Sequence, residues 1–181
     1  MKITYITAGA GGSYCGSCLR DAELVRALRA DGHDMLMLPL YTPPRVDGSS
    51  PASERIFYGG LSAWLEQHFS LFRRDLGPLD RLLDSPALLR LVSRFAVETR
   101  PEELGAMTVS VLRGKHGRQQ KELERLMDFL ENNERPDVVH LTNSMLSMLA
   151  PEIRERFDVP VVCGLQGERE FLREFPTRWR R

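Results

Sequence analysis

The chain has 181 residues, of which 42% are hydrophobic and 28% are charged, so it can bury the core of an ordinary globular domain. Its 25 basic and 25 acidic side chains cancel, which gives no electrostatic reason to expect a nucleic-acid partner. No apolar run reaches the roughly 20 residues that cross a bilayer, and no signal-peptide pattern precedes the first strand. We therefore expect a cytoplasmic protein, with a membrane surface left open as a partner.

The N-terminal part of the chain predicts a β-α-β unit. Residues 3–7 form a β-branched and aromatic run, 18–30 carry an apolar stripe of helical period, and 35–38 are continuously apolar. Gly32 stands where the helix must end, because glycine accepts the left-handed conformation found there. Uninterrupted apolar strands are typical of a parallel sheet that is covered on both faces.

The middle of the chain, about 41–135, is predicted to be an α-helical insertion. Residues 42–53 are rich in Pro, Ser and Gly and indicate a loop, and 56–58 form one short candidate strand. Several prolines in this region stand at positions where helices can begin without losing a hydrogen bond. The predicted helices are 61–72, 79–83, 87–97, 102–112 and 119–132.

The alternation of strands and helices returns near the end of the chain. Residues 138–141 and 161–165 are predicted strands, and 144–157 is the predicted helix between them. A chain that opens and closes with such units predicts a doubly wound α/β fold with a mainly parallel sheet. We treat 1–181 as a single Rossmann-like domain that contains the helical insertion.

A glycine-rich turn separates the first predicted strand from the first helix. Its centre is Gly11-Gly12-Ser13, flanked by two more glycines. Backbone N–H groups at the start of a helix attract anions, and glycine lets a ligand approach the backbone closely. We therefore predict that Gly11, Gly12 and Ser13 contact a phosphate or a sugar, although the glycines could also serve only the turn itself.

Two familiar glycine loops do not fit this turn. Tyr14 stands where the dinucleotide-binding fingerprint requires its third glycine or an alanine. Ser17 and Cys18 stand where a P-loop requires lysine followed by serine or threonine. A nicotinamide-dependent enzyme and a nucleoside triphosphatase are therefore both disfavoured.

Cys15 and Cys18 form a Cys-x-x-Cys pair where the first helix begins. A helix N-terminus stabilises a thiolate, so a thiol–disulfide oxidoreductase is an alternative function for the chain. Both cysteines could instead be small packing residues, a common role of free thiols. No second pair of cysteines or histidines follows with ligand spacing, so no metal site is predicted.

Polar side chains follow the two later predicted strands. His140 lies near the end of the strand 138–141, Asn143 lies just beyond it, and Gln166 follows the strand 161–165. The carboxyl ends of parallel strands meet at one edge of a sheet, which is where ligands bind in such folds. We predict His140 as a catalytic residue and Asn143 and Gln166 as substrate contacts. Asn143 could also simply cap the next helix.

Several segments together resemble the N-terminal domain of GT-B glycosyltransferases of family 4 (glycosyl transferase group 1). The resemblance lies in their order and spacing, and they bracket nearly the whole chain. They are the strand 2–7 with Gly11-Gly12, the stretch 23–33, Pro136-Asp-Val-Val-His140, and Asp158-Val-Pro-Val-Val162 through Gly167. The stretch 11–21 is also similar to a bacterial subgroup that carries this cysteine pair.

The resemblance implies a retaining transfer from a nucleotide-sugar donor to a sugar or lipid acceptor, with no metal or other cofactor. It implies that Gly11 and Gly12 lie near the donor diphosphate, and His140 matches a histidine common at that strand end. It further implies a C-terminal domain that holds most of the nucleotide. This chain is then expected to be the acceptor-side part of a longer polypeptide, inactive alone.

Two positions depart from the pattern of that family. Thr142 stands where the family often has a second histidine, and Gln166 stands where it often has another. No histidine role can be carried over to these two places. A noncatalytic sugar-binding domain of the same fold is a further alternative function.

Overall fold

The computed structural model describes residues 1–9, 15–42, 44, 46, 48–58, 65–74, 77, 101–133, 135–173 and 175–179. The predicted helices 79–83 and 87–97 lie outside the described residues, as do the predicted contacts Gly11, Gly12 and Ser13.

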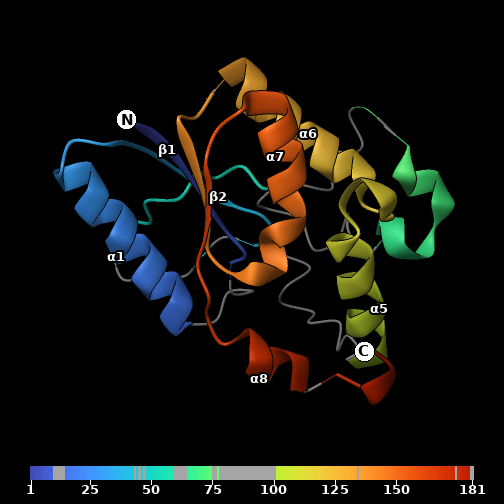
Figure 1. The fold of residues 1–181 in the computed structure, drawn as a ribbon. Helices are drawn as coiled ribbons and strands as arrows, with labels where there is room; N and C mark the ends of the chain where they lie inside the picture. Colours follow the sequence, from blue (N-terminus) through green and yellow to red (C-terminus); the bar gives the residue numbers. More distant parts are fainter. Residues whose placement is uncertain are drawn as a thin grey trace.

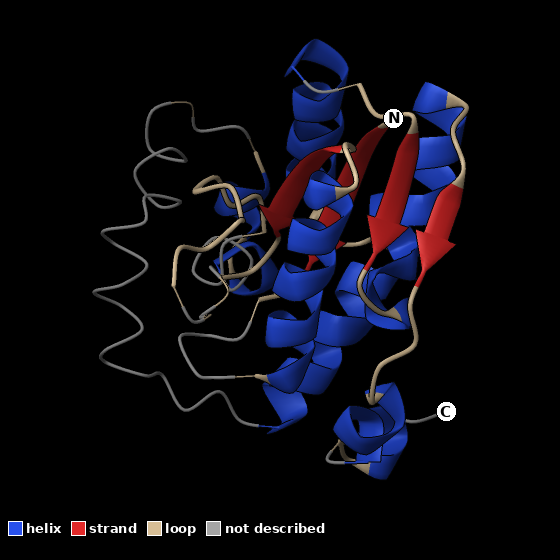
Figure 2. Cartoon of the chain, turned by 90° about the vertical axis from the view of Figure 1, so that its left-hand side faces the viewer, coloured by secondary structure: helices blue, strands red, loops and turns tan. Residues whose placement is uncertain are grey.

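Four parallel strands form the sheet in the described part of the chain, in the order β2-β1-β3-β4. Their arrowheads all point toward the end of the molecule that carries the C-terminus (Figure 2). The strands are β1 (Lys2–Thr7), β2 (Asp34–Pro39), β3 (Val138–Leu141) and β4 (Val161–Cys163). Tyr5 of β1 pairs with Met37 of β2 on one side and with His140 of β3 on the other, which gives the register of these three strands.

Helices cover both faces of this sheet, so the α/β doubly wound class is confirmed. Helix α1 (Gly16–Ala30) covers one face, and α6 (Gln120–Asn133) and α7 (Ala150–Phe157) cover the other (Figure 1). Among the described residues, no helix combines the length and apolarity needed to cross a membrane. The other elements named within the described ranges are α5 (Pro101–Leu112), α8 (Glu168–Arg173) and the 3-10 helices η1 (Ser70–Arg73), η2 (Gly114–His116), η3 (Ser144–Leu149) and η4 (Thr177–Trp179).

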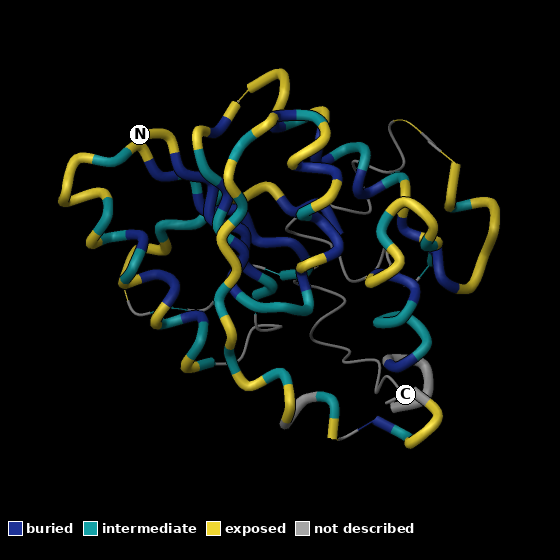
Figure 3. Tube along the Cα trace, viewed as in Figure 1, coloured by how far each residue is buried: buried dark blue, intermediate teal, exposed yellow. Residues whose placement is uncertain are grey.

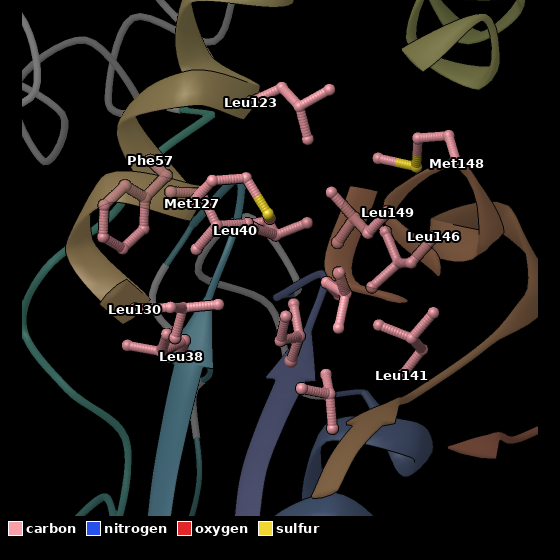
Figure 4. Packing of buried hydrophobic residues seen from close by; sticks show 14 of the residues in the cluster. Leu38, Leu40, Phe57, Leu123, Met127, Leu130, Leu141, Leu146, Met148 and Leu149 are labelled. Carbon is pink, nitrogen blue, oxygen red and sulfur yellow. The ribbon is translucent and has the colours of Figure 1, made fainter. Parts of the chain in front are cut away.

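The alternation of side chains along the strands divides the core between the two faces. Tyr5 and Met37 face α1 and pack with Val25, whereas Leu38 and Leu141 face the larger cluster. Figure 4 shows that cluster, which is filled from α6 and η3 by leucine and methionine side chains. Strands β1 and β2 are buried along most of their length, but β4 is mostly exposed (Figure 3).

The predicted helix 144–157 is wrong in its first half. Its residues form the 3-10 helix η3, and regular α-helix begins only at Ala150. Pro151 has no N–H with which to continue an α-helical hydrogen-bond ladder back through η3. The change of helix type turns Leu146 and Leu149 into the core between the sheet and α7.

Three other predicted elements also need correction. The strand predicted for 161–165 ends at Cys163, and Leu165 is exposed. The candidate strand 56–58 is buried but is not a strand of the sheet; the Tyr58 N–H donates to the carbonyl of Leu40, just beyond β2, at 2.9 Å. Within the predicted helix 61–72, the described residues are interrupted at Phe69, whose extended backbone separates a helical turn from η1.

Candidate functional site

A cleft of about 490 Å³ opens at the carboxyl edge of the sheet. The segments that follow all four strands line it, through Gly9 after β1, Tyr41 after β2, Asn143 after β3 and Gln166 after β4. The chain leaves β1 for one side of the sheet and leaves β3 for the other, so β1 and β3 flank the topological switch point. Open α/β sheets bind their ligands at this position.

The lining of the cleft has a polar part and an apolar part. The polar part comes from the start of α1, the loops after β3 and β4, the start of α8 and one residue of α5. It includes Cys15, Ser17, Thr108, Asn143, Gln166 and Glu168. The apolar part comes mainly from α5 and η3, and consists of Met107, Val111, Met145 and Leu146, with Tyr41 beside them. No group of His, Cys, Asp or Glu among the described residues is arranged to hold a metal ion. The cleft therefore suits a ligand that has both hydroxyl groups and an apolar portion.

Gly9 brings the loop after β1 against the loop after β2. Its φ is +82°, which favours glycine, and a Cβ there would lie 1.8 Å from the Thr42 carbonyl oxygen. Gly9, which flanks the predicted glycine turn, therefore lines the cleft, whereas residues 10–14 lie outside the described residues.

A buried carboxylate, Asp21 of α1, organises the floor beside the cleft. It accepts hydrogen bonds from the Tyr5 hydroxyl at 2.7 Å, from the Thr7 hydroxyl at 3.0 Å, and from the Thr142 hydroxyl. The Gln166 amide nitrogen donates to it at 3.3 Å and to the Thr142 carbonyl at 2.8 Å. Asp21 is 1% exposed. We call Asp21 and its four hydrogen-bond donors the carboxylate cluster; its hydrogen bonds connect α1 to β1, to the end of β3 and to the loop after β4.

Sequence reasoning did not assign Asp21 to the site. One signal was present, because Asp21 lies on the same face of α1 as Cys18 and Val25, three residues after one and four before the other. An acidic residue on the buried stripe of a helix needs hydrogen-bond donors from elsewhere in the fold. The cluster also gives Thr142 a role at the position where the resembling family often has a histidine.

His140 lies on the face of the sheet that α1 covers. Its ring contacts Tyr5 edge-on, with centroids 4.7 Å apart. Partial burial lowers the pKa of His140, and the charge of Asp21 opposes this effect, so the imidazole is neutral at pH 7. The described lining of the cleft does not include His140. Its assignment as a catalytic residue therefore stays a prediction.

The structure brings Asn143 and Gln166 together in the lining of the cleft, as expected from their positions after strands. Asn143 also caps η3, because its side-chain oxygen accepts from the Met145 N–H at 3.1 Å. Gln166 is oriented by the Thr142 carbonyl and by Asp21. Both residues therefore have structural roles in addition to facing the cleft.

Glu168 connects the two loops that follow β3 and β4. One carboxylate oxygen accepts from the N–H and the hydroxyl of Ser144, at 2.8 and 3.0 Å, and the other accepts from the Gln166 N–H at 2.7 Å. Partial burial raises the pKa of Glu168, but these hydrogen bonds outweigh it and hold the pKa below its ordinary value of 4.5. The ionised carboxylate therefore stabilises this side of the cleft.

Replacing Glu168 by glutamine is expected to lower the free energy of unfolding at pH 7 by about 1 kcal/mol, a value reduced by partial exposure of the site. Because the folded-state pKa is depressed, the contribution is complete above pH 4.5 and is lost as pH falls through the folded-state value. Urea unfolding from pH 7 down to pH 3.5 should show the gap between Glu168→Gln and the unaltered chain closing. Glu155→Gln, at an exposed glutamate of α7, is the control, and an equal gap there would contradict the assignment.

Comparisons of the chain with models of protein families, with curated proteins and with solved structures found no match. The function proposed below therefore rests on the chemistry of the cleft and on the sequence resemblance.

Proposed function

We propose that this chain is the acceptor-side domain of a retaining glycosyltransferase, which moves a sugar from a nucleotide-sugar donor to an acceptor. The observation that carries the proposal is the cleft at the carboxyl edge of the parallel sheet, lined from the ends of all four strands. Its position is the one at which α/β folds hold phosphorylated and sugar ligands. Three of the segments that resemble the glycosyltransferase family include residues of β1, β3 and β4, the strands whose following loops line this cleft.

The acceptor that fits this cleft carries a sugar on an apolar group. Asn143 and Gln166 offer amide groups that pair with sugar hydroxyls. Met107 and Val111 of α5 provide an opposite wall on which an alkyl or aryl group can pack. A ligand that buries its apolar part there gains roughly 25 cal/mol for each Å² removed from water.

The donor is proposed to bind between this chain and a second, C-terminal domain of the same polypeptide. In this arrangement the N–H groups of the glycine turn stabilise the negative charge that develops on the leaving nucleoside diphosphate. We thus propose a cytoplasmic transferase that uses no metal ion and no other cofactor. A noncatalytic sugar-binding domain would share the acceptor site but would lack the transfer.

Acceptor binding can be tested by titrating the ¹⁵N-labelled chain with octyl glucoside below its micellar concentration. We expect saturable shifts of the backbone amides of Gly9, Asn143 and Gln166, with a Kd of about 1 mM for so small a ligand. Thr108→Tyr places a larger side chain on the cleft face of α5 and should weaken binding at least tenfold, about 1.4 kcal/mol.

Leu112→Tyr is the matched control on the same helix, because Leu112 is exposed and does not line the cleft. Equal binding by the two tyrosine variants would contradict the assignment of the acceptor site. Transfer itself is measured as release of nucleoside diphosphate from UDP- and GDP-sugars by the polypeptide that joins this chain to its second domain. Binding without such release would favour the noncatalytic alternative.

A further inference from the structure

Cys15 and Cys18 occupy different environments at the start of α1. Cys15 is the residue before the first helical turn, is half-buried, and lines the cleft. Cys18 is three residues further along the helix and is 3% exposed. Cys15 has the extended backbone of an N-cap residue, and its thiol interacts with the Cys18 thiol. One sulfur is therefore open to the cleft, and the other lies directly behind it.

Hydrogen bonding and burial separate the acidities of the two thiols. The Ser17 hydroxyl lies 2.9 Å from the Cys15 sulfur, and this contact, followed by the Cys18 N–H, lowers the pKa of Cys15. Burial, followed by the charge on Cys15, raises the pKa of Cys18 to about 12. The thiolate is the reactive form of cysteine, so the accessible member of the pair is the nucleophile and the buried one stays a thiol.

Cys163 provides an internal comparison within the same chain. It ends β4 and is exposed, and it is absent from the lining of the cleft. Partial burial of its sulfur and the charge of Glu168 raise the pKa of Cys163. If exposure governed reactivity, Cys163 would react first, whereas stabilisation of the thiolate favours Cys15.

We propose that Cys15 is a thiol modification site that opens on the cleft, and that hydroperoxides convert Cys15 and Cys18 into an intramolecular disulfide. The Cys15 thiolate attacks a peroxide oxygen, so that an S–O bond forms, the O–O bond breaks, and the alcohol or water leaves after taking a proton. The Cys18 sulfur then attacks the Cys15 sulfenic acid. An S–S bond forms, the S–O bond breaks, and water leaves with the Cys18 proton. The cysteine pair supplies the two electrons that reduce the peroxide.

This inference is independent of the proposed function, because it requires only the cleft and the two sulfur atoms. Cys15 should also react with soft electrophiles such as iodoacetamide. The cleft is the route by which either reagent arrives, so Thr108→Tyr should slow the modification of Cys15 and leave Cys163 unaffected.

The test is a pulse of substoichiometric iodoacetamide at pH 7, followed by peptide mass spectrometry. We expect Cys15 to be labelled at least tenfold faster than Cys163, although Cys163 is more exposed, because the thiolate fraction sets the rate. In a separate sample that has not been alkylated, hydrogen peroxide should lower the mass of the chain by two hydrogen atoms and join Cys15 to Cys18. Faster labelling of Cys163 would overturn the proposal.

Three single-serine variants complete the experiment. Cys163→Ser should leave disulfide formation unchanged, and Cys15→Ser should abolish the reaction with peroxide. Cys18→Ser should stop the reaction at a Cys15 sulfenic acid that dimedone traps. Far-ultraviolet circular dichroism confirms that each variant is folded. If Cys15 and Cys18 were both still free thiols after the folded chain had been treated with peroxide, the inference would be contradicted.

Discussion

Replacing Asp21 by alanine is expected to lower the free energy of unfolding by about 3–5 kcal/mol, as measured by urea denaturation at pH 7. The substitution removes an acceptor that four side chains share. These are Tyr5 and Thr7 of β1, Thr142 and Gln166. Each buried donor left without a partner costs about 1–3 kcal/mol. Releasing a buried carboxylate from its desolvation offsets several kcal/mol of that sum, which is why the expected loss is smaller than four full penalties.

The control is Glu23→Ala on the same helix, two residues further along. Glu23 is exposed and pairs with Arg26 on the surface, so its loss should cost less than about 0.5 kcal/mol. Asp21→Asn tests the chemistry of the group, because the amide keeps the size of the side chain but offers one acceptor oxygen in place of two. We expect its stability to lie between those of Asp21→Ala and the unaltered chain. If Asp21→Ala were no less stable than Glu23→Ala, the carboxylate cluster would not organise the fold as described.

The strands and the fold class followed from local patterns in the sequence. The apolar run 35–38 and the segment 138–141 are short, continuous and bounded by polar or turn residues, and they lie in β2 and β3, the two neighbours of β1 in the sheet. Gly32 ends α1 with a φ of +86°, as its position predicted. These features were predictable because each depends on neighbours within a few residues.

The parts that were missed depend on contacts between distant segments. Asp21 meets Thr142 and Gln166 across 121 and 145 residues, and no periodicity within α1 indicates such partners. The apolar wall of the cleft is similar, because the helical pattern of 101–112 does not reveal that Met107 lies opposite the strand ends. Asn143 and Gln166 were found only because residues that follow parallel strands gather at one edge.

Replacing Gly9 by alanine is expected to destabilise the chain by at least about 2 kcal/mol more than replacing Gly32 does. Both glycines have a left-handed backbone, with φ of +82° and +86°, so both substitutions cost about 1–2 kcal/mol in conformational strain. A Cβ at Gly32 meets nothing within 4 Å, but one at Gly9 would lie 1.8 Å from the Thr42 carbonyl oxygen. The difference between the two variants therefore isolates the contact between the loops after β1 and β2.

That contact also sets the shape of the cleft, because Gly9 and Tyr41 line it from neighbouring loops. If the Gly9→Ala chain stays folded, its loops must separate, and octyl glucoside should bind more weakly than to Gly32→Ala. Urea unfolding measures the first effect, and amide shift titration measures the second. Equal free energies of unfolding for the two variants would show that the loops after β1 and β2 can separate without loss of stability. The cleft would then not be the preorganised site that transfer of a sugar requires, because catalysis depends on groups held in place before the substrate arrives.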